Sequence, residues 1–367
     1  MSPPSLQHAP IRSPVAPLLS QPVDRQLVTC PTPGCGCYPL RADRVNRHLA
    51  RCPQLVQQRA LAELGIYSPA VNVGKFIVGD EPPASSTPLL DATAFQRRIV
   101  DAHAHSMRSI LSHTPAAFSP VAVDAMSVRE AERERHRTQR KSIASYMHSM
   151  GLLGRGHRIV EMGAGNAQLS LAIARQPFVP VSHDSFILLD KQKPRRSADD
   201  QLTRLGLQVE RFRVGLEDLD LYGLMARDAS TRPSIVISKH LCGAATDFAL
   251  NAIAATAARD ARMRPAAVVL GSCCHHRCEW RSYPNRPFLA DLGFTSAADF
   301  DALCRVSSRG VDPHDRSERA RTGRLAKDLL DWGRAEFLRA AGYRTVRLHT
   351  YVDASVSPEN VLIIGVD

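Results

Sequence analysis

The 367-residue sequence contains few aromatic side chains and no long apolar run. Phenylalanine, tryptophan and tyrosine make up 5% of the chain, which does not favour a protein that stacks nucleic acid bases on an aromatic platform. No stretch approaches the roughly 20 consecutive apolar residues of a membrane-spanning helix. Prolines stand near the amino terminus, where a signal peptide has an apolar core. We therefore expect no membrane association and a cytoplasmic or nuclear location, or both.

Acidic residues are in deficit. The chain has 36 Asp and Glu against 47 Lys and Arg, a formal net charge of +11. Such an excess favours a polyanionic partner such as nucleic acid over an acidic small molecule, although a generally basic proteome would produce the same excess. Hydrophobic residues, at 44%, suffice for a sizeable core in one large domain with attachments or in two domains.

The cysteines do not form the pattern of a disulfide framework. There are nine, an odd number, and they gather in clusters, which favours metal ligands and buried thiols. The first cluster lies in CPTPGCGCYPLRADRVNRHLARC, residues 30–52, a segment too short to be held together by hydrophobic burial alone. His48 and Cys52 are one helical turn apart and can face one ion. We expect a structural zinc (Zn²⁺) bound by Cys30, Cys37, His48 and Cys52, with Cys35 as an alternative to Cys37 and incidental reduced thiols as the alternative to zinc.

The stretch RIVEMGAGNAQLSLAIARQ, residues 158–176, predicts a buried strand, a glycine turn and a helix. Gly163 and Gly165 let the backbone approach a ligand, and the helix beyond them leaves free N–H groups that point at it. A dinucleotide site needs a third glycine, and Gln168 stands there instead. Glu161 would repel phosphate but suits the cationic methionine end of S-adenosylmethionine. The alternative is a glycine turn that serves only to reverse the chain.

Acidic residues follow two further predicted strands. Asp190 ends FILLD, where it could accept both ribose hydroxyls of an adenosine, and an acid in the loop at 216–218 could accept the adenine amino group. The candidate cofactor-binding residues are Glu161, Gly163, Gly165, Asn166, Asp190, Glu217 and Asp218.

Strands and helices alternate after the glycine turn, in the way that builds a parallel sheet. A fourth strand is expected over 234–243 and a fifth over 266–278, and a helix over 321–341 precedes two closing strands that form a hairpin. Seven such strands predict an α/β fold of the class I (Rossmann-like) S-adenosylmethionine methyltransferase type, whose ligands bind at the carboxyl ends of the strands.

Two reactive sequences, SKHLCG and GSCCHHRC, are expected at those carboxyl ends. The chain lacks the Asn-Pro-Pro-Tyr or Asp-Pro-Pro-Tyr sequence of many methyltransferases that act on exocyclic amines, and it lacks the Pro-Cys of pyrimidine C5 methyltransferases. An alcohol acceptor fits better, and it needs a base to remove its proton. The candidate catalytic residues are Lys239, His240 and His275. A second zinc site is the alternative for the CCHHRC segment.

The expected organisation has four parts. A disordered arm rich in proline, serine and glutamine covers 1–26, the zinc finger 27–55, a linker and helical segment 56–125, and the methyltransferase domain 126–367. A helix with a basic middle, from Arg133 to Lys141, is either a solvated face or an RNA contact, and His103 and His105 are expected to be packed or solvated rather than ligands.

Several segments resemble one known family, the eukaryotic tRNA ribose 2′-O-methyltransferases that modify the fourth nucleotide of the acceptor stem. They are EMGAGNAQLS, LLDKQKPRRSADDQL, ISKHLCGAATD, CCHHRCEW, DLLDWGRAEFL and SPENVLII, and the resemblance runs from about residue 30 to the end of the chain. It implies S-adenosylmethionine as methyl donor, tRNA as substrate and a zinc finger that helps to hold the RNA. No obligate protein partner is expected.

The sequence departs from that family in two ways. The usual finger has Cys-His-His-Cys ligands, and here the cluster of Cys35, Gly36 and Cys37 occupies the second histidine position, with a slightly lengthened spacing to His48. Many members also carry another cysteine-rich finger upstream, whereas residues 1–29 contain no cysteine. Binding of RNA would then depend more on the basic helix at 133–141 and on Arg195 and Arg196. The competing hypotheses are an RNA-binding protein without catalysis and a methyltransferase for a tRNA base or a protein side chain.

Overall fold

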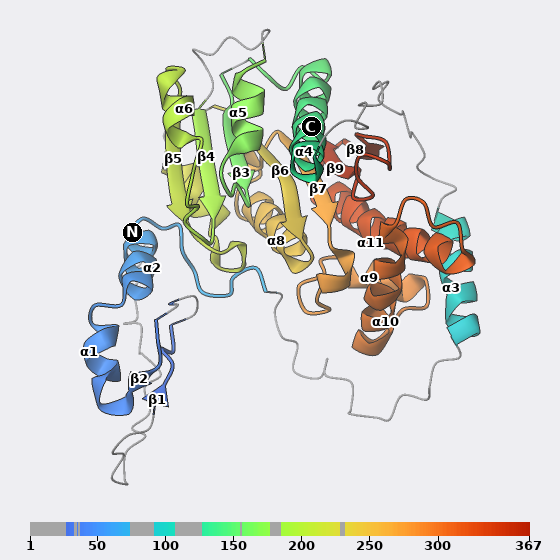
Figure 1. Ribbon diagram of the computed structural model, residues 1–367, viewed down its shortest axis with the longest axis horizontal. Coiled ribbons are helices and arrows are strands. Elements are labelled where there is room, and N and C mark those ends of the chain that lie inside the picture. The colour runs from blue at the N-terminus through green and yellow to red at the C-terminus, as the bar shows by residue number, and fades with distance from the viewer. Residues whose placement is uncertain are drawn as a thin grey trace, which may run out of the picture. The chain divides into compact units, whose positions relative to one another are not determined.

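The computed structural model describes residues 27–32, 35, 37–73, 92–106, 127–154, 156–176, 185–227 and 232–367. The arm expected at 1–26 lies outside the described residues. The chain divides into two compact units, residues 1–59 and residues 60–367 (Figure 1). No helix within the described ranges has the length and apolar character needed to cross a bilayer.

The first unit is a small arrangement of short elements (blue in Figure 1). Strands β1 (Leu27–Val28) and β2 (Leu40–Arg41) pair antiparallel, and the 3-10 turn η1 (Ala42–Arg44), helix α1 (Val45–Leu49) and the start of helix α2 (Pro53–Glu63) follow. Among its described residues, Cys52 is the only hydrophobic side chain that is buried. So small an apolar interior does not by itself stabilise a fold, which agrees with the expected need for another constraint.

The second unit is built on one seven-stranded sheet. Its strand order is β5-β4-β3-β6-β7-β9-β8, in which the first five strands are parallel and β9 runs antiparallel to both neighbours. The sequence-based expectation of a mixed α/β fold with a central, mostly parallel sheet is confirmed. The strands are β3 (Arg158–Met162), β4 (Ser185–Asp190), β5 (Gln208–Arg213), β6 (Ser234–Cys242), β7 (Ala267–Cys273), β8 (Thr345–Thr350) and β9 (Val361–Val366).

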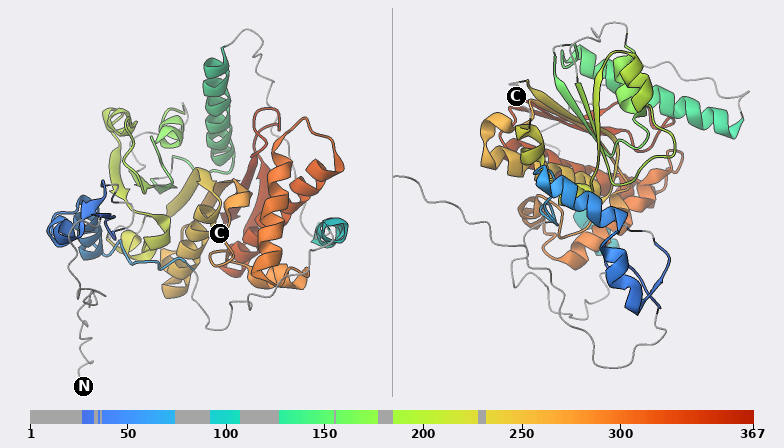
Figure 2. Two further views of the ribbon diagram at one scale, coloured as in Figure 1. Left: turned by 60° about the horizontal axis from the view of Figure 1, so that its bottom comes forward. Right: turned by 90° about the vertical axis from the view of Figure 1, so that its left-hand side faces the viewer.

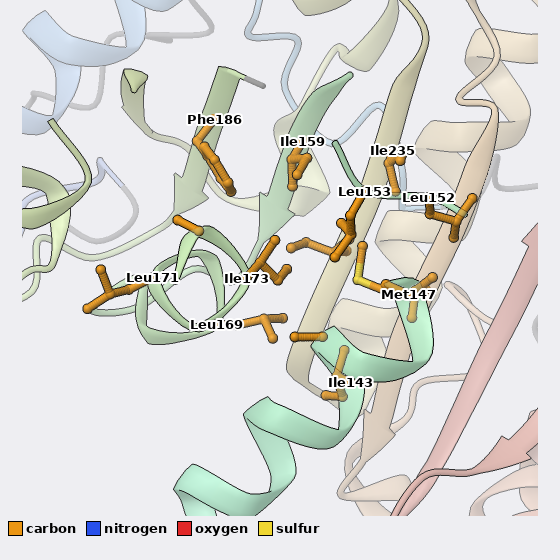
Figure 3. Packing of buried hydrophobic residues seen from close by; sticks show 14 of the residues in the cluster. Ile143, Met147, Leu152, Leu153, Ile159, Leu169, Leu171, Ile173, Phe186 and Ile235 are labelled. Atoms are coloured by element: carbon orange, nitrogen blue, oxygen red, sulfur yellow. The ribbon is translucent and has the colours of Figure 1, made fainter. Parts of the chain in front are cut away.

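Helices cover both faces of this sheet, because successive side chains of a strand point to opposite faces. Ile159 and Ile235 pack with helices α4 and α5 on one face, where Ile143 and Met147 of α4 point toward them (Figure 3). On the other face, Val160 packs with buried apolar side chains of α7, α8 and α11. Helices α4 and α8 therefore lie on opposite sides of the sheet (Figure 2). The helices are α4 (Val128–Ser149), α5 (Gln168–Ala174), α6 (Asp199–Arg204), α7 (Leu221–Ala226), α8 (Ala244–Arg259) and α11 (Glu318–Ala340).

A third apolar cluster joins helix α3 (Ala92–Ser106) to the second unit. Phe95 and Ile99 of α3 pack with Phe294 and Phe300, and Arg98 forms an ion pair with Asp299. Helices α9 (Arg286–Asp291) and α10 (Ala297–Ser307) flank this cluster, and the 3-10 turns η2 (Leu216–Asp218), η3 (Ala261–Met263), η4 (His275–Arg277) and η5 (Ser308–Val311) complete the elements. Part of the segment expected as a linker therefore contributes to the core of the second unit.

The fifth predicted strand extends five residues beyond the end of the observed strand. The expected range is 266–278, but β7 ends at Cys273. Cys274 takes a left-handed conformation with φ 53°, which ends the strand, and η4 follows. The helix expected over 321–341 begins three residues earlier, at Glu318, because the Ser317 hydroxyl accepts a hydrogen bond from the Ala320 N–H and caps it.

Candidate active site at the carboxyl ends of the strands

The glycine turn between β3 and α5 lies at the carboxyl edge of the sheet. Gly163 and Gly165 have φ of 66° and 48°, conformations that favour glycine. A Cβ on Gly163 would lie 2.9 Å from Leu241 Cδ2 and 3.2 Å from the His240 carbonyl oxygen. The absence of a side chain at Gly163 therefore lets the turn approach the end of β6, where two candidate catalytic residues stand.

Glu161, near the end of β3, is 3% exposed, so its side chain lies inside the turn rather than at the open edge. Its Oε2 accepts hydrogen bonds from the Ser170 backbone N–H at 3.2 Å and from the Ser170 hydroxyl. Burial raises the pKa of Glu161 to about 7, and the bonds from Ser170 offset only part of that effect. The carboxyl group can therefore change its protonation state near neutral pH.

Asp190 connects the end of β4 to the glycine turn. Its Oδ2 accepts the Gly165 N–H at 2.7 Å, and its Oδ1 accepts the Gln192 N–H at 2.8 Å. Each carboxylate oxygen keeps a further lone pair, so the group can still accept hydroxyl donors. Asn166 is exposed, and its carbonyl accepts the Ala198 N–H at 3.0 Å. The structure thus brings the predicted residues of the turn together with Asp190.

The two acids of η2 have other partners. Glu217 Oε1 lies 2.5 Å from Lys191 Nζ, which places it near the residue that follows Asp190. Asp218 Oδ1 accepts the Ala70 N–H at 2.7 Å, and burial raises the pKa of Asp218. The side chain of Asp218 therefore already holds the segment around Ala70, whereas Glu217 lies closer to the predicted cofactor residues.

Lys239 and His240 form a polar cluster with His136, which was not among the candidate site residues. Lys239 Nζ lies 2.6 Å from His240 Nε2 and 3.0 Å from Nδ1 of His136, which comes from α4. The rings of His136 and His240 are 5.9 Å apart at 88°. The basic composition around His136 suggested only a solvated face or an RNA contact, and no local pattern marks a pairing across 103 residues.

The surroundings of this cluster favour the uncharged forms of its lysine and histidine side chains. Burial, reinforced by the Arg140 cation, lowers the pKa of Lys239 to about 8. Partial burial, together with Lys239 and His136, lowers the pKa of His240 to about 4, and burial likewise lowers the pKa of His136. At neutral pH both imidazoles are therefore neutral, and the lysine is an ammonium that loses its proton more readily than an exposed lysine does.

His275 lies in a separate, buried network. Its Nε2 is 2.9 Å from Asp331 Oδ1, and Asp331 also accepts hydrogen bonds from Ser272 and Arg334 at 2.7 and 2.9 Å. Burial acts to lower the pKa of His275, but the Asp331 carboxylate outweighs it and raises the pKa. Nothing among the described contacts joins His275 to Lys239, so the structure brings together two of the three candidate catalytic residues.

A cavity of about 300 Å³ adjoins this network. Its lining includes His275, Lys327 and Glu359, and Lys327 Nζ lies 3.0 Å from Glu359 Oε2. His275 Nδ1 is 3.7 Å from the same oxygen. Within the lining His275 therefore lies beside two carboxylates, those of Asp331 and Glu359, and Lys327 pairs with Glu359, which favours a structural role for His275.

The first unit contains a cluster of cysteines and a histidine that could bind a metal ion. The ligand atoms of Cys30, Cys35, Cys37 and His48 all lie within 4.8 Å of one another. The Cys52 Sγ lies 3.5 Å from Cys35 Sγ and 3.9 Å from Cys30 Sγ. Three predicted ligands, Cys30, Cys37 and His48, therefore lie in one group with the alternative, Cys35, and the fourth, Cys52, lies beside two members of that group.

Comparisons with known proteins agree with one another. A family model described as Methyltransferase TRM13 matches residues 138–317 and 313–366. The tRNA:m(4)X modification enzyme TRM13 of Yarrowia lipolytica is 26% identical over 396 residues, which cover 93% of this chain and 81% of that protein. The enzyme of the same name from Schizosaccharomyces pombe is 26% identical over 66% of this chain and 71% of its own length, and the human homolog is 26% identical over 62% and 64%. Because the family model covers more than half of the residues, the chain belongs to the TRM13 family of methyltransferases.

Proposed function

We propose that this protein is a tRNA methyltransferase that transfers a methyl group from S-adenosylmethionine to the 2′-hydroxyl of the ribose at position 4, in the acceptor stem. Its relatives are named tRNA:m(4)X modification enzymes. The observation that carries the proposal is the approach of Gly163 to the end of β6, because it sets the predicted cofactor turn beside Lys239 and His240. The sheet order, with β9 antiparallel, supports a class I methyltransferase fold.

S-adenosylmethionine would be held by the turn and by the ends of β3 and β4. When bound, it supplies an electrophilic methyl group. Asp190 has lone pairs left for ribose hydroxyls, the turn from Gly163 to Asn166 offers close backbone approach, and Glu161 can ionise beside a cationic methionine end. Glu217, held by Lys191, is better placed than Asp218 to accept an adenine amino group.

Lys239 is the base that this arrangement favours. As an ammonium it donates hydrogen bonds to His136 Nδ1 and His240 Nε2, which therefore act as acceptors in the neutral imidazoles. Once it loses its proton, at a pKa of about 8, the amine can take the proton of the acceptor hydroxyl. The two histidines then position the amine, and such a base contributes about 10²- to 10⁴-fold to the rate.

Helix α4 supports tRNA as the substrate, because it carries His136 and exposed cations together. Arg133, Arg135 and Arg137 are exposed along it, and Arg195 and Arg196 are exposed after β4. Phosphate contacts from these side chains would fix the register of an A-form duplex, whose shallow minor groove displays 2′-hydroxyls. A cytoplasmic or nuclear location is part of the same proposal.

A structural zinc in the first unit completes the proposal. Two sulfurs bound tetrahedrally to one zinc, each at about 2.3 Å, lie about 3.8 Å apart. Cys35 Sγ is 3.5 Å from Cys52 Sγ and 3.3 Å from His48 Nε2, and Cys30 Sγ is 3.9 Å from Cys52 Sγ. These separations fit Cys35 as a ligand together with Cys30, His48 and Cys52, and Cys37, whose sulfur lies within 4.8 Å of those of Cys30 and Cys35, is the alternative.

The test is to incubate the purified protein with tritiated S-adenosylmethionine and total tRNA, and to map the labelled nucleotide. A 2′-O-methyl group blocks alkaline cleavage of the adjacent phosphodiester bond, so label should appear in an alkali-resistant dinucleotide from position 4. Label in an alkali-released mononucleotide would instead identify a base methyltransferase. A folded protein that binds tRNA but not S-adenosylmethionine would support the non-catalytic RNA-binding alternative.

A further inference from the structure

Three cysteines of the second unit gather where β6 and β7 end. Cys242 is the last residue of β6 and Cys273 the last residue of β7, and the two are direct partners in the parallel ladder. Their sulfur atoms are 3.4 Å apart, and the Cys274 sulfur joins them so that all three lie within 4.8 Å of one another. None of these thiols has a part in the function proposed above.

The backbone conformation of Cys274 brings its thiol, the third one, into the cluster. Successive side chains of a strand point to opposite faces, so Cys273 and Cys274 would diverge if β7 continued. Cys274 instead adopts φ 53° and ψ 46°, a left-handed conformation that is unfavourable for a residue with a Cβ. This turn ends the strand and directs two consecutive thiols toward Cys242.

The surrounding turn holds the three thiols in place. The Gly243 N–H, directly after Cys242, donates to the Cys273 carbonyl at 3.0 Å. A Cβ on Gly243 would lie 2.3 Å from the Arg277 carbonyl oxygen, so η4 packs closely against the β6–α8 turn. Cys273 is buried, Cys274 is half-buried and Cys242 is exposed, which leaves one side of the cluster open to solvent.

We propose that Cys242, Cys273 and Cys274 form a second metal site, which takes Zn²⁺ through three thiolates and leaves a fourth position open. Two sulfurs bound tetrahedrally to one zinc ion at about 2.3 Å lie about 3.8 Å apart, close to the 3.4 Å between the Cys242 and Cys273 sulfurs, and clustered thiolates select zinc over hard cations. Within the described residues, this cluster and the one in the first unit are the only two groups of this kind. Binding would displace one proton from each thiol, and it would fix the end of β6 three residues beyond Lys239.

The test is to count zinc in the full-length protein by mass spectrometry of the metal. Wild type should hold about two zinc ions per chain, the Cys242→Ser/Cys274→Ser variant about one, and the Cys30→Ser/Cys52→Ser variant about one. Cys304→Ser, which changes a buried cysteine outside both clusters, should still hold two. An unchanged zinc content in Cys242→Ser/Cys274→Ser would overturn the proposal.

A cobalt titration isolates the second site. In the Cys30→Ser/Cys52→Ser background, Co²⁺ should give a thiolate-to-cobalt charge-transfer band in the near ultraviolet, and adding Cys242→Ser should remove most of it. Because Cys242 is exposed, this change leaves the packed core intact, as tryptophan fluorescence can check. Alkylation under denaturing, non-reducing conditions shows which of the nine cysteines carry free thiols. The proposal fails if wild type holds one zinc ion and this alkylation finds either nine free thiols or a Cys242–Cys273 disulfide.

Discussion

The burial of Glu161 leads to a prediction in which one carboxyl group destabilises the fold above neutral pH. The pKa of Glu161 rises from 4.5 to about 7 because the side chain is buried. The native state therefore keeps this proton at pH values where the unfolded chain has already lost it. Stability is unaffected below pH 4.5, falls as the pH rises from 4.5 to 7, and stays reduced above 7.

The size of the effect follows from the two pKa values. At about 1.36 kcal/mol per pKa unit, the full penalty is about 3 kcal/mol above pH 8, and about 2 kcal/mol of it develops between pH 5.5 and 8.5. Glu161→Gln removes the titrating group and keeps an oxygen for the Ser170 donors. The difference in unfolding free energy between this variant and wild type should therefore grow by about 2 kcal/mol over that pH range.

Urea unfolding followed by tryptophan fluorescence measures this difference. Both tryptophans, Trp280 and Trp332, belong to the second unit and report on the sheet that contains Glu161. Glu210→Gln, which removes an exposed carboxylate from β5, is the matched control. If the Glu161→Gln difference is the same at pH 5.5 and 8.5, the buried carboxyl does not titrate as argued. The same variant should bind S-adenosylmethionine more weakly, since a cationic ligand favours the ionised group.

Four further predictions follow from the site. With Lys239 as base, the rate of single-turnover methylation should rise about tenfold per pH unit below pH 8 and level off above it. Lys239→Arg, whose side chain stays protonated, should lower this rate by about 10²- to 10⁴-fold. A rate in wild type that does not change with pH would contradict the assignment. Asp190→Ala should weaken S-adenosylmethionine binding about 10-fold or more by calorimetry, because hydrogen bonds to a charged group contribute about 1.5–3 kcal/mol. Cys35→Ser should lose the zinc of the first unit, whereas Cys37→Ser should keep it; the reverse result would restore the original assignment. Asp331→Ala leaves His275 and Arg334 buried without their shared carboxylate, and should cost about 3–5 kcal/mol of unfolding free energy in a urea titration.

The parts of the fold that the sequence predicts are those that local patterns specify. The glycine turn is one, because Gly163 and Gly165 take positive φ values that few other residues tolerate. The parallel strands are another, since runs such as FILLD are buried on both faces. The fifth strand was extended too far because nothing in CCHHRC marks the left-handed Cys274, and cysteine rarely takes that conformation.

The partners of the site residues were not predictable from local patterns. Asp218 bonds to the Ala70 backbone across 148 residues, and His275 bonds to Asp331 of α11 across 56 residues. A histidine beside reactive cysteines has the same local sequence whether it faces a substrate or a buried carboxylate. The distinction depends on which element covers it, and that is decided by tertiary packing.

The contact between His136 and Lys239 was not predictable from local patterns either. The packing of helix α4, which carries His136, explains why a basic helix lies at this edge of the sheet. Helix α4 packs Ile143 and Met147 against the sheet through one stripe of apolar residues, and this packing fixes the rotation of the whole helix. Two turns earlier, near the same stripe, His136 therefore reaches Lys239, while Arg133 and Arg137 remain exposed. The apolar contacts thus fix together the positions of His136, which contacts the proposed base Lys239, and of the arginines proposed to bind phosphates. A substitution such as Met147→Ala should then reduce methylation as well as stability, although it touches neither substrate.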